Sequence, residues 1–337
     1  MENLNNVFII AEAGVNHNGD FDMARRLVDA AKEAGADAVK FQTFHAASLA
    51  SSFAPKASYQ LETTDPTKSQ YDMLKSLELR EIEYVRLKEY SDKNGIEFLS
   101  SPFDPQNLRF LCELGIKKIK IPSGEITHLA LLEGAARVGL EVILSTGMSF
   151  LGEVERAVDV LTSGGLPRED ITILQCNTEY PTPVHDVNLK AMVTLGKSMR
   201  TQCGYSDHTT GIHIPVAAVA MGASMIEKHL TLDKTFSGPD HRASLEPEEF
   251  KTMVNWIRET ELAIGDGLKR PSSSEKRNRY IARKSLVASS VIKKGEIFTP
   301  DNLTAKRPGT GMSPMDWDLV LGKPAPKDFS IDDMVTL

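Results

Sequence analysis

The feature that most constrains the fold is a regular alternation of short apolar runs with longer segments of helical period. Segments such as 21–35 and 129–139 carry apolar residues three and four positions apart and end near a glycine, which predicts helices. Strands that alternate with helices pair in parallel, and eight such units favour a (β/α)₈ TIM barrel. An open doubly wound sheet is the alternative, although no glycine-rich dinucleotide loop follows the first run. The eight predicted strands are 7–13, 38–44, 96–100, 116–121, 141–144, 171–175, 202–205 and 224–232.

A change of composition near residue 268 divides the chain into two domains and a linker. We expect residues 1–268 to form the barrel and residues 269–282, with Pro271 followed by three serines, to form the linker. Residues 283–337 have short β-type runs and glycine turn signals, which predict a small β-rich domain. Because a domain of about 55 residues buries little core, we expect it to pack against a larger body.

The longest connection of the predicted barrel lies between its second and third strands. Residues 46–68 are rich in Ser, Ala, Thr and Pro and have no clear period, so we expect a loop over the barrel mouth. Apolar spacing predicts helices at about 70–77 and 81–94.

Charge, hydropathy and cysteine content exclude several classes of partner. The formal net charge of the 337 residues is −7 and there is no basic run, which argues against nucleic acid. The chain has no run of about 18 apolar residues and no charged-then-apolar leader, so we expect a cytoplasmic protein without membrane contact. Cys112, Cys176 and Cys203 lack CxxC spacing and are expected to be reduced thiols.

Polar side chains lie at the ends of all eight predicted strands. The catalytic groups of a barrel come from the carboxyl ends of its strands, so residues there carry functional weight. Any single one could be a helix cap or part of a structural ion pair, but eight that converge on one mouth predict a polar, charged ligand. The strand ends carry Glu12, Asn16, His17 and Asn18; Lys40 and Gln42; Ser100 and Ser101; Lys120, Ser123 and Glu125; Ser145 and Thr146; Asn177, Thr178 and Tyr180; Ser206, Asp207 and His208; and Glu227, Lys228 and His229.

Two of these residues, Lys40 and Lys120, lie inside apolar strands, where a lysine is rarely buried without an anionic partner. Each could form a structural pair with Glu12 or Glu125. Together with the strand-end serines they form a candidate cradle for phosphate and carboxylate groups. A Schiff-base role for either lysine is the chemical alternative.

His208 and His229 end neighbouring strands and could share one metal ion, and Glu227, two residues before His229 on the same strand face, could support them. Two imidazoles leave open positions for water and substrate oxygens, which is typical of a Lewis-acid site. Imidazoles alone favour Zn or Fe, whereas an oxygen-rich remainder suits Mn or Mg. Asp240 follows the last strand and lies either beside the mouth or in an ordinary turn.

The strand-end motifs resemble those of the sialic acid synthases, in the same order and over essentially the whole chain. The tail motif KRPG at 306–309, with Gly311, resembles the antifreeze-like (SAF, β-clip) domain that ends these enzymes. The barrel motifs are IAEAGVNHNG at 10–19, VKFQ at 39–42, KIPSGE at 120–125, STGM at 145–148, NTEYP at 177–181, GYSDH at 204–208, EKH at 227–229 and GPDH at 238–241.

The resemblance implies a set of ligands and residue roles. It implies a divalent metal, Mn²⁺ first and Mg²⁺ or Co²⁺ as alternatives, held by His208 and His229. It implies a domain-swapped homodimer in which the SAF domain of one subunit caps the barrel of the other and contributes Arg307. The residues matching the phosphoenolpyruvate site are Lys40, Ser101, Lys120, Ser123, Ser145, Ser206 and one or both of Asn177 and Thr178. Those matching the amino-sugar site are Glu12, Gln42, Tyr180 and Asp240, and Glu125 is counted among the substrate-binding residues.

The implied activity is that of a transferase. It condenses phosphoenolpyruvate with an N-acetylated aminohexose and releases phosphate by C–O cleavage, with Glu12 or Asp240 steering protons. N-acetylmannosamine, which gives N-acetylneuraminate, is the first expectation. A 6-deoxy-2,4-diacetamido sugar, which gives N,N'-diacetyllegionaminate, is the alternative, pseudaminate synthesis ranks third, and a non-catalytic sugar-binding protein is a remote possibility.

Overall fold

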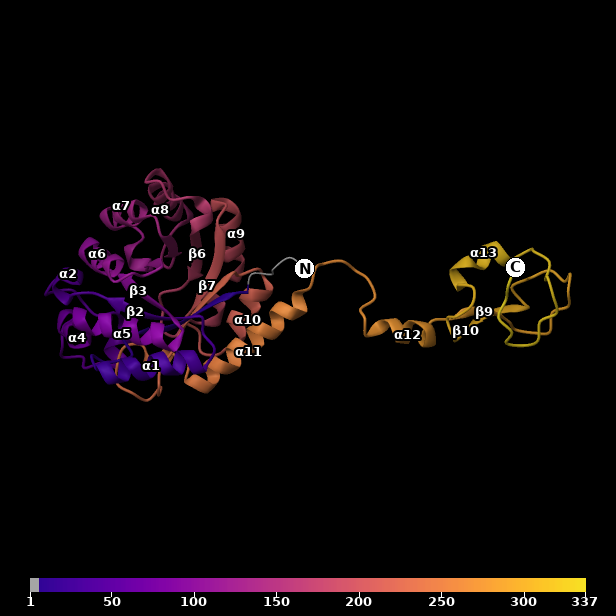
Figure 1. The fold of residues 1–337 in the computed structure, drawn as a ribbon, viewed down its shortest axis with the longest axis horizontal. Coiled ribbons are helices and arrows are strands. Elements are labelled where there is room, and N and C mark those ends of the chain that lie inside the picture. The colour runs from indigo at the N-terminus through magenta and orange to yellow at the C-terminus, as the bar shows by residue number, and fades with distance from the viewer. Residues whose placement is uncertain (1–5) are drawn as a thin grey trace. The chain divides into compact units, whose positions relative to one another are not determined.

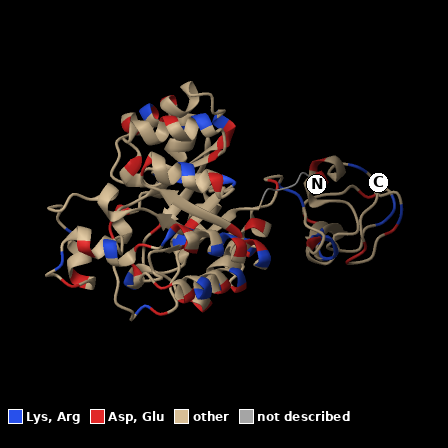
Figure 2. Ribbon diagram, turned by 60° about the vertical axis from the view of Figure 1, so that its left-hand side comes forward, with Lys and Arg blue, Asp and Glu red and all other residues tan. Residues whose placement is uncertain are grey.

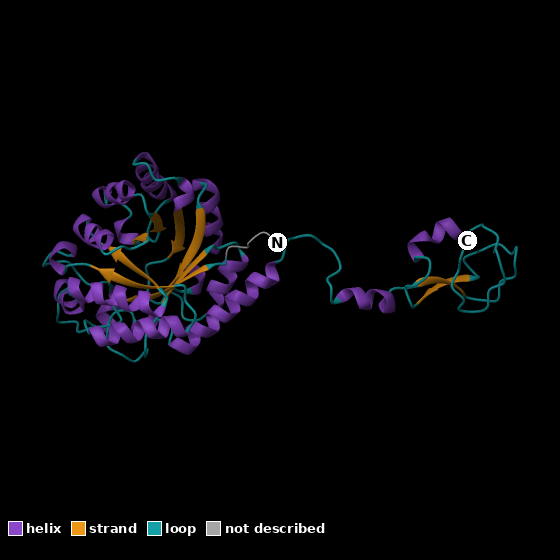
Figure 3. Cartoon of the chain, viewed as in Figure 1, coloured by secondary structure: helices purple, strands orange, loops and turns teal. Residues whose placement is uncertain are grey.

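The chain divides into two compact units, Met1–Gly265 and Asp266–Leu337, and the computed structural model describes residues 6–337. Eight parallel strands in the first unit confirm the predicted barrel (Figures 1 and 3). They are β1 (Phe8–Gly14), β2 (Ala38–Thr43), β3 (Glu97–Pro102), β4 (Lys118–Ile121), β5 (Glu141–Ser145), β6 (Ile171–Cys176), β7 (Gln202–Asp207) and β8 (Met225–His229). Their order in the sheet is β3-β2-β1-β8-β7-β6-β5-β4, and β3 and β4 lie against each other, so the sheet nearly closes.

Helices surround the strands of this unit (Figure 3). Their ends follow local signals: Asp104 accepts hydrogen bonds from the backbone of α6 at its N-terminus, and Gly139, at φ +71°, ends α7 in the left-handed region. The helices are α1 (Phe21–Glu33), α2 (Ala46–Leu49), α3 (Ser58–Thr63), α4 (Gln70–Leu77), α5 (Glu81–Asn94), α6 (Pro105–Glu113), α7 (Leu129–Val138), α8 (Leu151–Ser163), α9 (Leu189–Met199), α10 (His213–Ala220) and α11 (Pro247–Ile264), with short 3₁₀ turns η1 (Ser123–Glu125), η2 (Arg168–Asp170), η3 (Val184–Asp186) and η4 (His241–Ala243).

The predicted loop at 46–68 is partly helical, because it contains α2 and α3. Helix α3 has no buried residue, so it leaves no apolar period in the sequence. Its first turn is held instead by Gln60, whose side chain accepts a hydrogen bond from the backbone of Ala57 at 3.0 Å. The last strand also ends at His229, three residues earlier than predicted.

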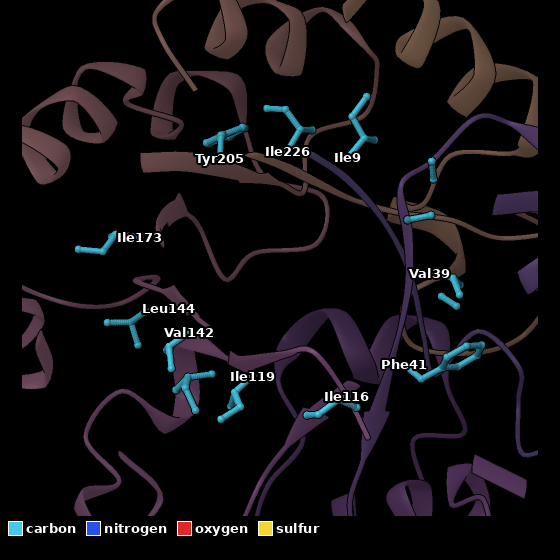
Figure 4. Packing of buried hydrophobic residues seen from close by; sticks show 14 of the residues in the cluster. Ile9, Val39, Phe41, Ile116, Ile119, Val142, Leu144, Ile173, Tyr205 and Ile226 are labelled. Atoms are coloured by element: carbon cyan, nitrogen blue, oxygen red, sulfur yellow. The ribbon is translucent and has the colours of Figure 1, made fainter. Parts of the chain in front are cut away.

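Successive strand residues point to opposite faces, and both faces begin apolar. Ile9, Val39 and Ile226 point outward into a core shared with the helices, where Figure 4 shows them beside equivalent residues of other strands. The inward positions form a separate apolar layer inside the barrel, made of Ile10, Ala38, Leu99, Ile143, Leu174 and Met225.

The second unit has a small antiparallel sheet and a core of its own. Its elements are α12 (Glu275–Ala282), β9 (Ser285–Ala288), β10 (Leu303–Lys306), the turn η5 (Pro314–Asp316) and α13 (Trp317–Val320). The core includes Leu286, Phe298 and Phe329. Helix α12 occupies much of the segment predicted to be a linker, 269–282, and all its side chains are at least partly exposed.

Charged residues of both signs are interspersed along the outer helices of the first unit (Figure 2). Within residues 6–337, every helix is too short or too polar to cross a membrane.

Candidate active site

The inward positions of the strands change from apolar to polar toward the carboxyl end of the barrel. On β1 the inward residue after Ile10 is Glu12, and on β5 the inward residue after Ile143 is Ser145. The parallel ladders align these positions, since Glu12 is in register with both Lys40 and His229. They form one surface, here called the polar floor, which consists of Glu12, Lys40, Gln42, Ser101, Lys120, Ser145, Ser206, Glu227 and His229.

Four buried charges meet at the centre of the floor. Lys120 Nζ lies 2.8 and 3.0 Å from the two carboxylate oxygens of Glu227. Lys40 Nζ lies 3.7 Å from Glu227 and forms a shorter ion pair with Glu12. Ser206 donates a hydrogen bond to Glu227 at 3.1 Å. Glu227 therefore joins the two lysines that the sequence predicted as anion-binding groups.

The protonation equilibria of these groups follow from burial and from their neighbours. Burial alone would raise the pKa of the Glu227 carboxyl, but Lys120 and Lys40 outweigh burial and lower that pKa to about 2. Burial lowers the pKa of Lys120, and Glu227 offsets only part of that effect. Burial opposes the charge of Lys40 as well, but Glu12 and Glu227 outweigh it and raise the pKa of Lys40. The carboxylate of Glu227 is thus held ionised between two ammonium groups.

A cavity of about 230 Å³ opens above the floor. It brings together most of the residues that the sequence singled out, from all eight strands and the loops that follow them. Those lining it are Glu12, Lys40, Gln42, Ser101, Lys120, Ser123, Ser145, Thr178, Tyr180, Ser206, His208, Glu227, His229 and Asp240.

The serines on one side of the cavity are packed closely against the backbone. Ser123 Oγ accepts a hydrogen bond from the Gly147 backbone at 2.9 Å, and a Cβ atom on Gly147 would lie 2.9 Å from that oxygen. A larger residue at position 147 would therefore displace the side chains of Ser123 and Thr178. The buried hydroxyl of Ser145 has no hydrogen-bond partner within residues 6–337, so it is available to a ligand.

Asn177 and Thr178 are adjacent in the sequence, but their side chains lie in different places. Thr178 lines the cavity. The side chain of Asn177 turns away and donates a hydrogen bond to the Asp186 carbonyl at 2.9 Å, while the backbone carbonyl oxygen of Asn177 is hydrogen-bonded to His208 Nδ1.

The rings of His208 and His229 lie close enough together to share a metal ion. Their ring centroids are 5.4 Å apart, and two imidazoles that bind one ion at about 2 Å from nitrogen bring their rings to within roughly 6 Å. The carbonyl of Asn177 fixes the His208 ring and leaves Nε2 for a ligand. His229 Nδ1 is buried without a partner among the described residues. Between residues 6 and 337 no group of three or more His, Cys, Asp or Glu side chains is arranged to hold a metal, so an ion here would take its other ligands from water or substrate.

Asp240 lies on the loop after β8 and is buried in the cavity wall. Burial raises the pKa of this carboxyl to about 7, with Glu12 adding to the effect. Its backbone carbonyl accepts a hydrogen bond from Ser244 at 2.7 Å, and the next residue, His241, is hydrogen-bonded to Thr231 at 2.7 Å. Asp240 is therefore a fixed carboxyl group that titrates near neutral pH.

Of the predicted site residues in the first unit, Asn177 and Glu125 do not line the cavity. Glu125 belongs to η1, where its carboxylate is 2.7 Å from His128 Nδ1. Arg307 lies in the second unit, where its exposed side chain donates a hydrogen bond to the Ala282 carbonyl at 3.0 Å.

The comparisons with known proteins identify both units. The NeuB family profile matches residues 27–269, and the SAF domain profile matches residues 283–337. The chain belongs to the NeuB family. The predicted resemblance to sialic acid synthases, the SAF domain and the transferase class are confirmed.

The relatives of this NeuB protein include enzymes named for the synthesis of legionaminic acid and of N-acetylneuraminic acid. The chain is 52% identical over 327 residues to an N,N'-diacetyllegionaminic acid synthase of Campylobacter jejuni, covering 97% of this chain and 98% of that protein. It is 47% identical over 317 residues to a Legionella pneumophila enzyme of the same name, covering 94% and 89%. The crystal structure of an N-acetylneuraminic acid synthetase from Leptospira borgpetersenii matches with a TM-score of 0.71 and 38% identity, covering 82% of this chain and 93% of that one.

Sequence reasoning missed two features of the NeuB site. It treated Glu227 as a support for the histidines, whereas the structure pairs it with both lysines. The sequence did indicate that the lysines need carboxylate partners, because Lys40 and Lys120 lie inside apolar strands. It also missed an apolar side of the cavity, formed by Val15, Met73, Leu74, Leu77 and Phe103.

Proposed function

We propose that this chain is an N,N'-diacetyllegionaminate synthase. It condenses phosphoenolpyruvate with a 6-deoxy-2,4-diacetamidomannose and water, and it releases phosphate by C–O cleavage. The observation that carries the proposal is the 52% and 47% identity to two enzymes of that name over nearly the whole chain, against 38% to the N-acetylneuraminic acid synthetase structure. The barrel fold alone does not choose between the two sugars. The comparisons thus reverse the order that the sequence favoured, in which N-acetylmannosamine came first.

The polar floor offers donors for both anionic groups of phosphoenolpyruvate. Lys40 and Lys120 supply ammonium groups, and Ser145 supplies a buried hydroxyl that has no competing partner in the described part of the chain. Glu227 holds both lysines at the cavity, so these donors are already oriented when the substrate binds. We assign Glu227 the positioning of the lysines.

The reaction also needs a proton exchanged near neutral pH, because water adds at carbon 2 of phosphoenolpyruvate. Asp240 fits this task, since its pKa is about 7 and its loop is anchored. Glu12 accepts a hydrogen bond from Gln42 at 3.0 Å and pairs with Lys40. We therefore assign proton exchange to Asp240 and the orientation of Gln42 and Lys40 to Glu12.

His208 and His229 would hold the divalent metal, with Mn²⁺ as the first candidate and Mg²⁺ or Co²⁺ as alternatives. Neutral imidazole is the form that binds metals, and burial lowers the pKa of both rings, to about 4 for His208. When bound, such an ion supplies a Lewis acid for the aldehyde oxygen of the open-chain sugar.

The proposal is tested by incubating the protein, Mn²⁺ and phosphoenolpyruvate with each sugar separately and identifying the products by mass spectrometry. We expect N,N'-diacetyllegionaminate from the 6-deoxy-2,4-diacetamidomannose, with a higher kcat/KM than for N-acetylmannosamine. Faster turnover of N-acetylmannosamine would return the assignment to N-acetylneuraminate synthesis.

The proposal extends to the swapped homodimer that the family resemblance implies, in which Arg307 of the partner subunit reaches the sugar. It is supported by the KRPG motif and by the exposure of the Arg307 side chain. We expect Arg307→Ala and Lys120→Ala to be inactive alone. After the two variants are dissociated and reannealed together, about a quarter of wild-type activity should return, because half the dimers then contain one complete site. If each tail serves its own barrel, no mixed dimer has a complete site and mixing restores nothing.

A further inference from the structure

The cavity has one side that differs chemically from the polar floor. Val15, Met73, Leu74, Leu77 and Phe103 line it, and together they are called here the apolar wall. Three of them come from helix α4, whose Met73 and Leu77 are one helical turn apart and buried.

The apolar wall belongs to a hydrophobic cluster distinct from the barrel core. Its buried members are Val15, Phe44, Met73 and Leu77, and Leu49, Leu74 and Phe103 pack against them. Phe44 and Phe103 meet edge to face with ring centroids 5.9 Å apart. The insertion between β2 and β3 therefore forms a small core of its own, and part of that core faces the substrate cavity.

The position of helix α4 is fixed by close contacts. Ser69 and Asp72 cap its N-terminus reciprocally, with the Ser69 hydroxyl accepting a hydrogen bond from the Asp72 backbone at 3.1 Å. At its C-terminal end, a Cβ atom on Gly19 would lie 2.6 Å from the Ser76 carbonyl oxygen. Because Gly19 also has φ +76°, only glycine allows the β1–α1 turn to approach so closely. Helix α4, which carries three residues of the apolar wall, is thus capped and packed closely against the β1–α1 turn.

A fully hydroxylated sugar fits such a wall poorly, because a hydroxyl group placed against it loses its hydrogen bonds to water. The reacting aldehyde end must lie at the polar floor, beside the lysines and histidines. The opposite end of the sugar chain, at C6, then extends away from the floor. A 6-deoxy sugar ends there in a methyl group, which has no hydrogen bond to lose.

We infer that the apolar wall receives the C6 methyl group of the sugar and makes the site selective for 6-deoxy substrates over their 6-hydroxy counterparts. This inference rests on the proposed function and names the residues that select its substrate. An apolar pocket discriminates against an added hydroxyl by about 10²-fold, so we expect a kcat/KM preference of that size.

The test compares two sugars that differ only in the 6-hydroxyl: 2,4-diacetamido-2,4,6-trideoxymannose and 2,4-diacetamido-2,4-dideoxymannose. The ratio of their kcat/KM values is measured for the wild type and for Leu74→Gln and Met73→Gln, which make the wall polar. We expect each variant to lower the ratio about tenfold, mainly by losing activity on the 6-deoxy sugar. Leu49→Gln is the matched control, since Leu49 packs on the same cluster without lining the cavity, and it should leave the ratio unchanged.

The outcomes separate this inference from the proposed function. A wild-type enzyme that condenses neither sugar with phosphoenolpyruvate contradicts both. A wild-type ratio near one contradicts the inference alone and needs no variant to do so. The same conclusion follows if both wall variants keep their melting temperature and the wild-type ratio, or if Leu49→Gln lowers the ratio as much as they do.

Discussion

Two layers of inward-pointing side chains lie on the same strands inside the barrel, but they have opposite effects on stability. On β5, Ile143 belongs to the apolar inner layer and Ser145, two residues later, belongs to the polar floor. The lower layer buries hydrocarbon and stabilises the fold. The floor buries two lysines and two glutamates, whose ion pairs offset the cost of removing them from water only in part, and the Ser145 hydroxyl, which has no partner among residues 6–337. The polar floor is therefore the part of the barrel where burial lowers stability and provides groups that can bind a ligand.

The largest effect that can test this comparison is removal of the proposed metal ligands. We expect His208→Ala and His229→Ala each to lower kcat/KM by roughly 10³-fold or more while the barrel stays folded, because the metal supplies several kcal/mol to the reaction. Mn²⁺ binding, followed by electron paramagnetic resonance, should weaken in parallel. His185→Ala changes an exposed histidine and is the matched control. If the His208→Ala, His229→Ala double variant binds Mn²⁺ as tightly as the wild type does, these two histidines do not hold the metal ion.

A matched pair of substitutions on β5 tests the two layers directly. Ile143→Ala should destabilise the protein by about 2–5 kcal/mol, because it opens a cavity in the closed apolar layer. Ser145→Ala should change stability by less than about 1 kcal/mol, because its buried hydroxyl has no partner to lose. It should instead raise the KM for phosphoenolpyruvate about tenfold, as expected when a hydrogen bond to a charged group is lost. Chemical denaturation and steady-state kinetics on both variants give the answer. A large loss of stability in Ser145→Ala with an unchanged KM for phosphoenolpyruvate would mean that Ser145, like Ile143, contributes to the fold and not to substrate binding.

A smaller effect is expected in the pH dependence of stability. The pKa of Asp240 is raised from 3.8 to about 7, so the folded state binds this proton more tightly than the unfolded state. Its burial therefore lowers stability progressively as the pH rises from about 4 to about 7, and no further above that. Asp240→Asn removes this loss and should stabilise the ligand-free protein by up to about 4 kcal/mol at pH 8 but not at pH 4.

The control for this prediction is Asp22→Asn, which makes the same change at an exposed position. It should show no such difference between the two pH values. A constant effect of Asp240→Asn at both pH values would mean that the carboxyl group is ionised throughout, and that it cannot exchange protons near neutral pH.

The sequence predicted the barrel and most of the floor, because both depend on local patterns. The polar residue at each strand end can be identified in the sequence. Parallel strands then place their carboxyl ends at the same end of the barrel. The sequence indicated that the buried lysines need carboxylates, but it did not identify Glu227 as the partner of Lys120, because these residues are 107 positions apart and their contact depends on the distance across the barrel. The separate tasks of Asn177 and Thr178 depend on which way each side chain turns.

The apolar wall was missed for a different reason. Met73 and Leu77 have the spacing of any amphipathic helix, and nothing local distinguishes residues that face a substrate from residues that face a core. We infer that the choice of sugar depends on this side of the cavity, whereas the strand-end motifs that predicted the polar floor are expected in both types of enzyme.

The measurement that tests the account most directly follows the oxygen atoms of phosphoenolpyruvate. The protein is supplied with Mn²⁺, phosphoenolpyruvate and 2,4-diacetamido-2,4,6-trideoxymannose in water enriched in oxygen-18, and the released phosphate is analysed by mass spectrometry. The account predicts one phosphate for each N,N'-diacetyllegionaminate formed, with no solvent oxygen in it, because water attacks carbon 2 and the C–O bond breaks. Phosphate that carries a solvent oxygen, or product formed without phosphate release, would contradict it.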